Sequence, residues 1–191
     1  MKAWKRLAGG RYVDLNNLTV DDIDIDDINV ALNHVYRFNG HYKDNKPLTV
    51  AQHTLLCVHI ADMIFPEDNE IRIATIIHDF GETYYGDIAT PVKHAFGEAF
   101  KQFAKPIDDA IDQKFWHVPN ENGPNPTVKS CVKVCDLISL DIERRAMWKS
   151  QHGKDKWPTT PDIKLSLLDK QAMFDEVASI KFVDLKGLLN V

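Results

Sequence analysis

Histidine and carboxylate side chains lie together in one short stretch of this sequence, "IIHDFGETYYGD". His78 and Asp79 follow two isoleucines, and Glu82 comes one helical turn later. Polar and charged side chains are rarely buried without a partner, so an apolar run that ends on such a pair needs something to compensate it. A bound divalent metal ion is the compensation that this pair suggests.

Two further residues complete a set of metal ligands. His53 falls in the first turn of a predicted helix, and Asp136 follows "KVC" in a later one. With His78 and Asp79 they supply two imidazoles and two carboxylates, a donor set that suits Zn, Co, Mn, Fe or Mg. Four protein ligands on an ion that accepts five or six leave positions for water and substrate, as hydrolysis requires.

Helices are expected to position these residues, because apolar side chains recur at helical spacing along most of the chain. Thr49 and Gln52 form a capping-box signature at the start of the helix that carries His53. A second helix is predicted over "EIRIATIIHDFGETYY", where His78 and Glu82, four residues apart, would face the same side. A third is predicted over "VKSCVKVCDLISLDIERRAMWKS", which contains Asp136.

The remaining segments fit the same architecture. Thr90 is expected to cap a helix, Pro106 to begin another, and residues from about 164 to 186 to form the last one. The Pro- and Asn-rich "VPNENGPNPT" reads as a loop. Since no β-α-β alternation occurs, the sequence predicts an all-α helical bundle.

Composition limits the broad class of protein. A chain of 191 residues that is 44% hydrophobic suits a single domain over 1–191, with the metal-site core at about 25–150. The net charge of -5 gives no general attraction to nucleic acid or to an anionic membrane. Three cysteines, an odd and low number, favour small core residues in a reducing cytoplasm over a disulfide framework. No apolar run is long enough to span a membrane, so a soluble protein is expected.

The order of His53, the His78-Asp79 pair and Asp136 resembles the metal-binding signature of the HD-domain phosphohydrolases. "YRFNGHYKDNKPLTVAQHTLL", "HDFGETYYGDIATPVK" and "VKVCDL" resemble in particular the branch of bacterial YfbR-like deoxynucleotidases and phage deoxyadenosine triphosphate triphosphohydrolases. This resemblance implies an HD-domain helical bundle, often dimeric, with one divalent metal. It also implies a small deoxynucleotide substrate, either a monophosphate or a triphosphate, with dATP among the expected triphosphates.

The resemblance assigns roles on the phosphate side of the site. Arg37 matches an arginine ahead of the metal histidine, and a guanidinium suits bidentate capture of phosphate. Lys93 and Lys133 match lysines that meet phosphate oxygens. Together these three cations would offset charge during displacement at phosphorus.

On the water and sugar side, Glu82 matches the residue that positions or deprotonates the attacking water. Asp87 matches an acid that accepts a hydrogen bond from the sugar 3'-hydroxyl. Phe38 stands where the branch tends to have a tryptophan, so it keeps an aromatic wall but lacks the indole N-H.

Two other function classes remain open. One is a phosphodiesterase or alarmone hydrolase, but a tandem-metal site needs extra histidines between Asp79 and Asp136, and only His94 and His117 lie there. The other is a non-catalytic nucleotide sensor, against which the presence of Glu82 argues. Glu143, seven residues beyond Asp136, is expected to form a structural ion pair.

Overall fold

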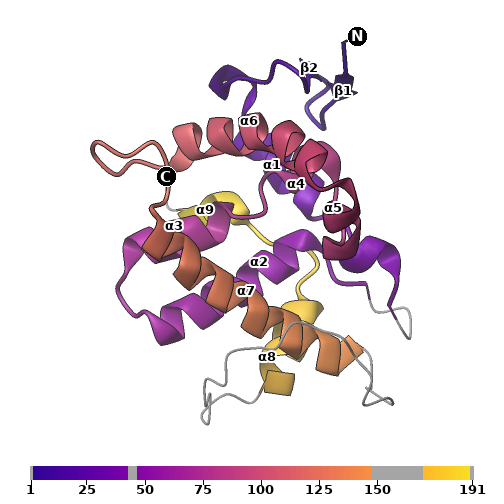
Figure 1. The fold of residues 1–191 in the computed structure, drawn as a ribbon. Coiled ribbons are helices and arrows are strands. Elements are labelled where there is room, and N and C mark those ends of the chain that lie inside the picture. Colours follow the sequence, from indigo (N-terminus) through magenta and orange to yellow (C-terminus); the bar gives the residue numbers. More distant parts are fainter. Residues whose placement is uncertain (1, 43–46, 148–169, 190–191) are drawn as a thin grey trace.

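The structure, a computed structural model, describes residues 2–42, 47–147 and 170–189, and most of them are helical (Figure 1). This confirms the predicted all-α class. Two short 3-10 helices are η1 (Val20–Asp22) and η2 (Arg37–Gly40). In chain order the α-helices are α1 (Ile25–Leu32), α2 (Val50–Ile64), α3 (Asn69–Ile77), α4 (Glu82–Tyr85), α5 (Thr90–Phe96), α6 (Glu98–Phe115), α7 (Pro126–Met147), α8 (Lys170–Ser179) and α9 (Leu185–Leu189).

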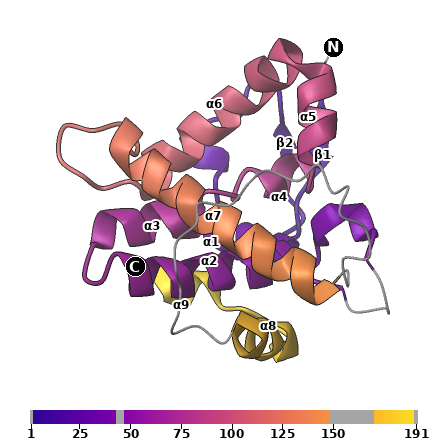
Figure 2. The same ribbon diagram turned by 60° about the horizontal axis from the view of Figure 1, so that its bottom comes forward.

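Helix α2 lies at the centre of the fold. It packs against α3, α7 and α8, while α3 and α7 also contact each other. Apolar residues are buried on every side of α2, with Leu56 and Ile60 fully enclosed, as expected for a helix that is covered all round. In Figure 2, α6 and α7 diverge from the loop that joins them. The predicted loop therefore separates the two helices, and the mutually packed α2, α3 and α7 carry or directly precede the four predicted metal ligands.

A short antiparallel hairpin precedes the helices and was not expected from the sequence. Its strands are β1 (Trp4–Arg6) and β2 (Tyr12–Asp14), paired with Lys5 opposite Val13. The Nζ atom of Lys5 donates hydrogen bonds of 2.9 Å to the main-chain carbonyls of Thr83 and Tyr84. The hairpin is thus tied to α4, and such a small pair of strands depends on contacts of this kind for its stability.

The helix predicted across His78 and Glu82 is interrupted. Helix α3 ends at Ile77, and α4 begins only at Glu82. Between them the main chain forms a tight turn in which each N-H bonds the carbonyl three residues earlier. Phe80 N-H donates to the Ile77 carbonyl (3.0 Å), and Glu82 N-H donates to the Asp79 carbonyl (3.0 Å). The prediction of one continuous helix was wrong, and this tighter turn sets the directions of the His78 and Asp79 side chains.

Pro106 also differs from its expected place, because it lies inside α6 and does not begin a helix. A proline in a helix interior removes one main-chain hydrogen bond. Pro106 is on the exposed side of α6, where water can satisfy the carbonyl that loses its donor. Exposure therefore makes this interruption tolerable within a helix that is otherwise anchored by Ile107 and Ile111.

The last predicted helix, at about 164–186, is only partly correct. Residues 164–169 lie outside the described part of the chain, and the rest divides into α8 and α9 with an extended segment between them. Val183 N-H in that segment donates to Oδ1 of Asn33 (2.7 Å), and the N-H of Leu185, the first residue of α9, donates to Oδ1 of Asn29 (3.0 Å). These distant partners on and beside α1 replace the hydrogen bonds that a continuous helix would have made.

Gln52 attaches the C-terminal end of α8 to the helix that carries His53. Its Nε2 atom lies within hydrogen-bonding distance of three main-chain carbonyls, the shortest at 2.8 Å to Ile180. We expect Gln52→Ala to lower the free energy of unfolding by about 1–3 kcal/mol, because buried carbonyls lose their donor. Denaturant titration measures this change. Gln102→Ala on an exposed position of α6 is the control, and an equal loss in both variants would contradict the assignment.

The cysteines and the helix lengths bear on two further expectations. Cys57, Cys131 and Cys135 are all free thiols, and Cys57 and Cys135 are buried. Across the part of the chain that the structure describes, no helix combines the length and apolar character needed to cross a membrane. The cytoplasmic location and the single-domain organisation stay predictions.

Candidate metal centre

His53 is fully buried on α2, and its ring orientation is fixed from one side. Its Nδ1 atom lies 2.6 Å from Oε1 of Glu143. Since a carboxylate accepts, Nδ1 is the ring nitrogen that donates here, which leaves Nε2 as the atom available to a cation. Nε2 faces Oδ2 of Asp79 and Oδ1 of Asp136, each at 3.5 Å. His53 therefore presents an electron pair to two carboxylates.

His78, the residue directly after α3, has a similar arrangement. Its Nδ1 atom donates to the main-chain carbonyl of Thr75 at 2.7 Å. Its Nε2 atom is buried and has no hydrogen-bond partner within the described residues, although Oδ2 of Asp79 lies only 3.2 Å away. A lone pair held beside a carboxylate oxygen is repelled unless a proton or a bound cation lies between them. The unpaired atom is therefore an observation that fits a cation.

The spacing of these donor atoms also fits a single divalent ion. Metal bonds of about 2.1 Å at tetrahedral angles place neighbouring donors about 3.4 Å apart. The nitrogen-to-oxygen separations among His53, His78, Asp79 and Asp136 are 3.2, 3.5 and 3.5 Å. The structure thus brings all four predicted ligands together from α2, the turn after α3, and α7.

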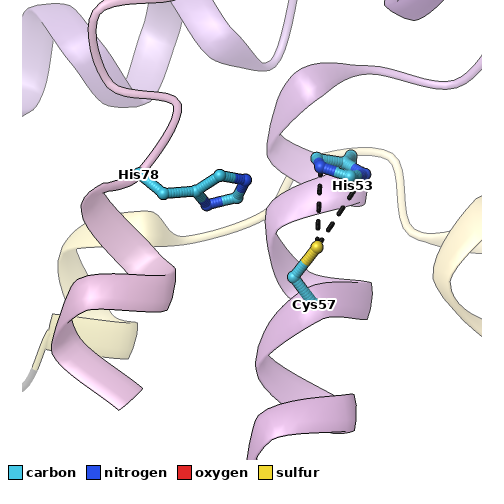
Figure 3. Close-up of side chains that lie close together, drawn as sticks. All are labelled: His53, Cys57 and His78. Atoms are coloured by element: carbon cyan, nitrogen blue, oxygen red, sulfur yellow. Dashed lines mark hydrogen bonds between the residues drawn. The ribbon is translucent and has the colours of Figure 1, made fainter. Parts of the chain in front are cut away.

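Cys57 is a further donor beside the two histidines, and Figure 3 shows its sulfur below the ring of His53, toward which His78 points from the neighbouring helix. One donor atom from each of these three residues lies within 4.8 Å of the others. However, Sγ of Cys57 is 3.5 Å from Nε2 and 3.9 Å from Nδ1 of His53. Because these two distances are nearly equal, the sulfur does not lie along the in-plane lone-pair direction of either nitrogen. Burial also raises the pKa of this thiol well above its usual range. The carboxylates are the better ligands.

Electrostatics in the cluster favour bound positive charge. Burial opposes ionisation of Asp79, yet its pKa lies well below the usual range because His78, His53 and Arg37 surround it. Burial likewise opposes a charged His78, but Asp79 and Asp136 raise the pKa of that imidazole to about 9. Protons therefore occupy the cluster when no cation does, and cation binding would release them.

Arg37 begins the 3-10 helix η2 and lies against the same carboxylates. Its Nη1 atom is 3.8 Å from Oδ2 of Asp79 and 4.0 Å from Oδ1 of Asp87, and its buried Nε atom has no hydrogen-bond partner within the described residues. Burial opposes the charge of the guanidinium, yet Glu143, followed by Asp79 and Asp87, raises its pKa. The group is permanently charged and still has a free donor.

Phe38 follows Arg37, and its ring centroid lies 5.3 Å from the guanidinium carbon. The main chain is left-handed at Phe38 (φ 57°) and at Asn39 (φ 52°), a conformation that residues with a side chain adopt infrequently. The aromatic wall expected from the sequence is thus beside the predicted phosphate ligand. Strained main chain of this kind often occurs at functional sites.

Glu82 begins α4 and is 2% exposed. Oε1 lies 3.4 Å from Nζ of Lys93, while Oε2 is buried with no hydrogen-bond partner within the described residues. Burial, and then the charges of Asp79 and Asp87, raise the pKa of this carboxyl to about 9. Glu82 is therefore a partly unsatisfied acid directly beside the candidate metal ligands.

Asp87 and Lys133 complete the predicted set. Asp87 follows Gly86, and its largely buried side chain faces Arg37. Lys133 lies on α7, and its Nζ atom is 2.6 Å from Oδ2 of Asp136. The side chain of Lys133 is 64% exposed, so it lies on the solvent-facing side of the cluster. Every site residue expected from the sequence therefore lies at or beside this centre.

Sequence reasoning missed the connections of Glu143. The expected ion pair exists, with Nη2 of Arg37 at 3.3 Å, but the same carboxylate also contacts His53. The available signal was the seven-residue spacing from Asp136, which places both acids on one face of α7. Spacing alone does not show which residues that face will meet.

Two curated proteins align with most of this chain. One is the uncharacterized protein RCAP_rcc00048 of Rhodobacter capsulatus, 32% identical over 143 residues, which are 74% of this chain and 71% of that protein. The other is the uncharacterized protein YfdR of Escherichia coli, 33% identical over 136 residues, which are 71% of this chain and 67% of YfdR. This chain belongs to the same family as these two proteins. No protein-family model matches it.

Proposed function

We propose that this protein is an HD-type, metal-dependent phosphohydrolase that acts on deoxynucleotides. One observation carries the proposal: two imidazole Nε2 lone pairs converge with Asp79 and Asp136 at separations suited to one divalent cation. The names of the two relatives state no activity, so the argument rests on the site and on the resemblance to HD-domain phosphohydrolases.

His53, His78, Asp79 and Asp136 would hold the cation. When bound, a divalent ion lowers the pKa of a water ligand, polarises a phosphate oxygen and offsets the negative charge around Asp79. Zn, Co, Mn and Mg all suit this mixed donor set. The protein's own contribution is the fixed direction of both imidazoles, which Glu143 and the Thr75 carbonyl set through the opposite ring nitrogens.

Arg37, Lys93 and Lys133 would bind phosphate oxygens around this centre. With a divalent charge held beside it, Glu82 would be ionised, and its carboxylate would orient the attacking water and accept its proton as the water oxygen approaches phosphorus in line. The phosphorus-oxygen bond to the nucleoside breaks on the opposite side, the departing nucleoside oxygen takes a proton from solvent, and no covalent bond to the protein forms. Because the same three cations would serve a monophosphate or a triphosphate, the geometry favours neither substrate.

A panel of deoxynucleotides and ribonucleotides tests this function directly. The protein loaded in turn with Co, Mn, Zn or Mg is incubated with each compound, and the released phosphate or triphosphate is identified. We expect cation-dependent hydrolysis of deoxynucleotides, and the product distinguishes a nucleotidase from a triphosphohydrolase. Cleavage of phosphodiesters or alarmones alone would favour the second enzyme class. Tight binding with no turnover of any compound would favour a sensor.

Asp87 gives a prediction about the sugar. If its carboxylate accepts the 3'-hydroxyl, a substrate without that group leaves a buried acceptor unpaired at a cost of roughly 1–3 kcal/mol. We expect kcat/KM for a 3'-deoxy analogue to fall by about 5- to 150-fold. In the Asp87→Asn variant, the difference in kcat/KM between the parent substrate and the 3'-deoxy analogue should be smaller than in the wild type. Equal cleavage of the analogue and its parent by the wild-type protein would remove this role from Asp87.

A further inference from the structure

Glu143 contacts a candidate metal ligand, His53, and a candidate phosphate ligand, Arg37, without being a candidate metal ligand itself. It lies on α7, is 0% exposed, and uses its two oxygens differently. Oε1 accepts from Nδ1 of His53 at 2.6 Å and from Oγ of Ser139 at 3.1 Å. Oε2 lies 3.3 Å from Nη2 of Arg37 and accepts from it. A single carboxylate therefore connects an imidazole with a guanidinium.

These contacts leave Glu143 little freedom. A buried carboxylate is costly unless its lone pairs are satisfied, and here three donors converge on it from α2, η2 and α7. Rotation that improved the contact with Arg37 would weaken the contact with His53, because both oxygens belong to one rigid group. The opposite face of each partner points into the site: Nε2 of His53 toward Asp136, and Nη1 of Arg37 toward Asp79.

We infer that Glu143 is a positioning residue that aligns His53 for a cation and Arg37 for an anion, and thereby links the two binding events. The inference rests on the proposed function, whose site it describes in more detail. The negative charge makes His53 a stronger donor to a cation. The same charge holds Arg37 so that its remaining N-H groups face the place where a phosphate would bind.

Cation affinity separates this role from a purely structural one. The test uses the metal-depleted full chain and Co²⁺ alone, with affinity measured by competition against a chromophoric chelator. We expect Glu143→Gln to weaken Co²⁺ binding by about 10- to 100-fold, because the amide keeps the shape but loses the charge and the defined acceptor. If Glu143→Gln binds Co²⁺ within about twofold of wild type, the inference is wrong whatever happens to the melting temperature.

Asp141→Asn is the matched control. Asp141 is also a buried acid on α7, but it pairs with Arg144 (3.0 Å) and Arg145 (2.8 Å). This variant should leave Co²⁺ affinity within about twofold while testing the general effect of neutralising an acid on this helix. An equal loss of affinity in both variants would contradict a specific role for Glu143.

The link to Arg37 is tested by a double-mutant cycle on Co²⁺ affinity. In the Glu143→Gln background, the effect of Arg37→Gln should differ at least about threefold from its effect in the wild type. Additive effects would refute the link.

Should Glu143→Gln fail to fold, Ser139→Ala removes one donor from the same carboxylate. That variant should weaken Co²⁺ binding by about 3- to 10-fold, and no change would overturn the inference. None of these measurements involves turnover. If the protein hydrolyses no deoxynucleotide, the proposed function is wrong, but the Co²⁺ affinities still test the role of Glu143.

Discussion

Glu82→Gln should bind its metal normally and yet lose about 100- to 10,000-fold in kcat, the usual contribution of a positioned acid-base group. The amide has the same shape as the carboxylate but cannot accept a proton from the attacking water. The bond that the main-chain N-H of Glu82 donates to the Asp79 carbonyl (3.0 Å) is kept in this variant, so cation content should stay that of the wild type. The unpaired buried oxygen of Glu82 is the atom expected to contact water.

Glu98→Gln provides the comparison for that experiment, because Glu98 is an exposed acid on α6 that pairs with Lys101 at 3.5 Å. Steady-state kinetics and elemental analysis on both variants separate catalysis from cation binding. Near wild-type turnover in Glu82→Gln would show that another group accepts the proton of the attacking water. Loss of the cation from this variant would instead show that Glu82 is a ligand.

His78→Ala and Asp136→Asn should each abolish stable cation binding. The isolated wild-type protein is expected to carry about one divalent ion per chain, held by four donors at most. Removing one donor from such a set takes away a bond and, for Asp136, a negative charge that the cation needs. Turnover should fall at least as far as in Glu82→Gln, and inductively coupled plasma mass spectrometry measures the metal directly.

His117→Ala removes an exposed histidine that follows α6 and should keep the full metal content. Stoichiometric metal in both His78→Ala and Asp136→Asn would show that the cluster binds no ion in solution. If these two variants keep the metal ion and Cys57→Ala loses it, the thiol of Cys57, and not the two carboxylates, is a ligand of that ion.

The sequence was informative where local rules decide the structure. The capping box of Thr49 and Gln52 is present, with Oγ1 of Thr49 accepting from Gln52 N-H at 3.1 Å, so His53 lies in the first turn as expected. The Pro-rich loop also lies where predicted, directly before α7. Both features depend on residues within a few positions of one another.

Long-range contacts explain what the sequence did not reveal. Helix α3 ends before His78 in a turn that directs the side chains of His78 and Asp79 toward His53 on α2. The break between α8 and α9 depends on Asn29 and Asn33, about 150 residues earlier. Glu143 shows the same limit at the site. Its place on the helix face was readable, whereas its contact with His53, 90 residues away, comes from the packing of α2 against α7.

Anomalous diffraction from crystals grown with Mn²⁺ or Co²⁺ tests the central claim most directly, because it locates the cation without reference to activity. We expect one strong peak within about 2.0–2.3 Å of Nε2 of His53, Nε2 of His78 and one oxygen each of Asp79 and Asp136. A peak bonded to Sγ of Cys57 and not to the carboxylates, or no peak in this cluster at saturating cation, would contradict it.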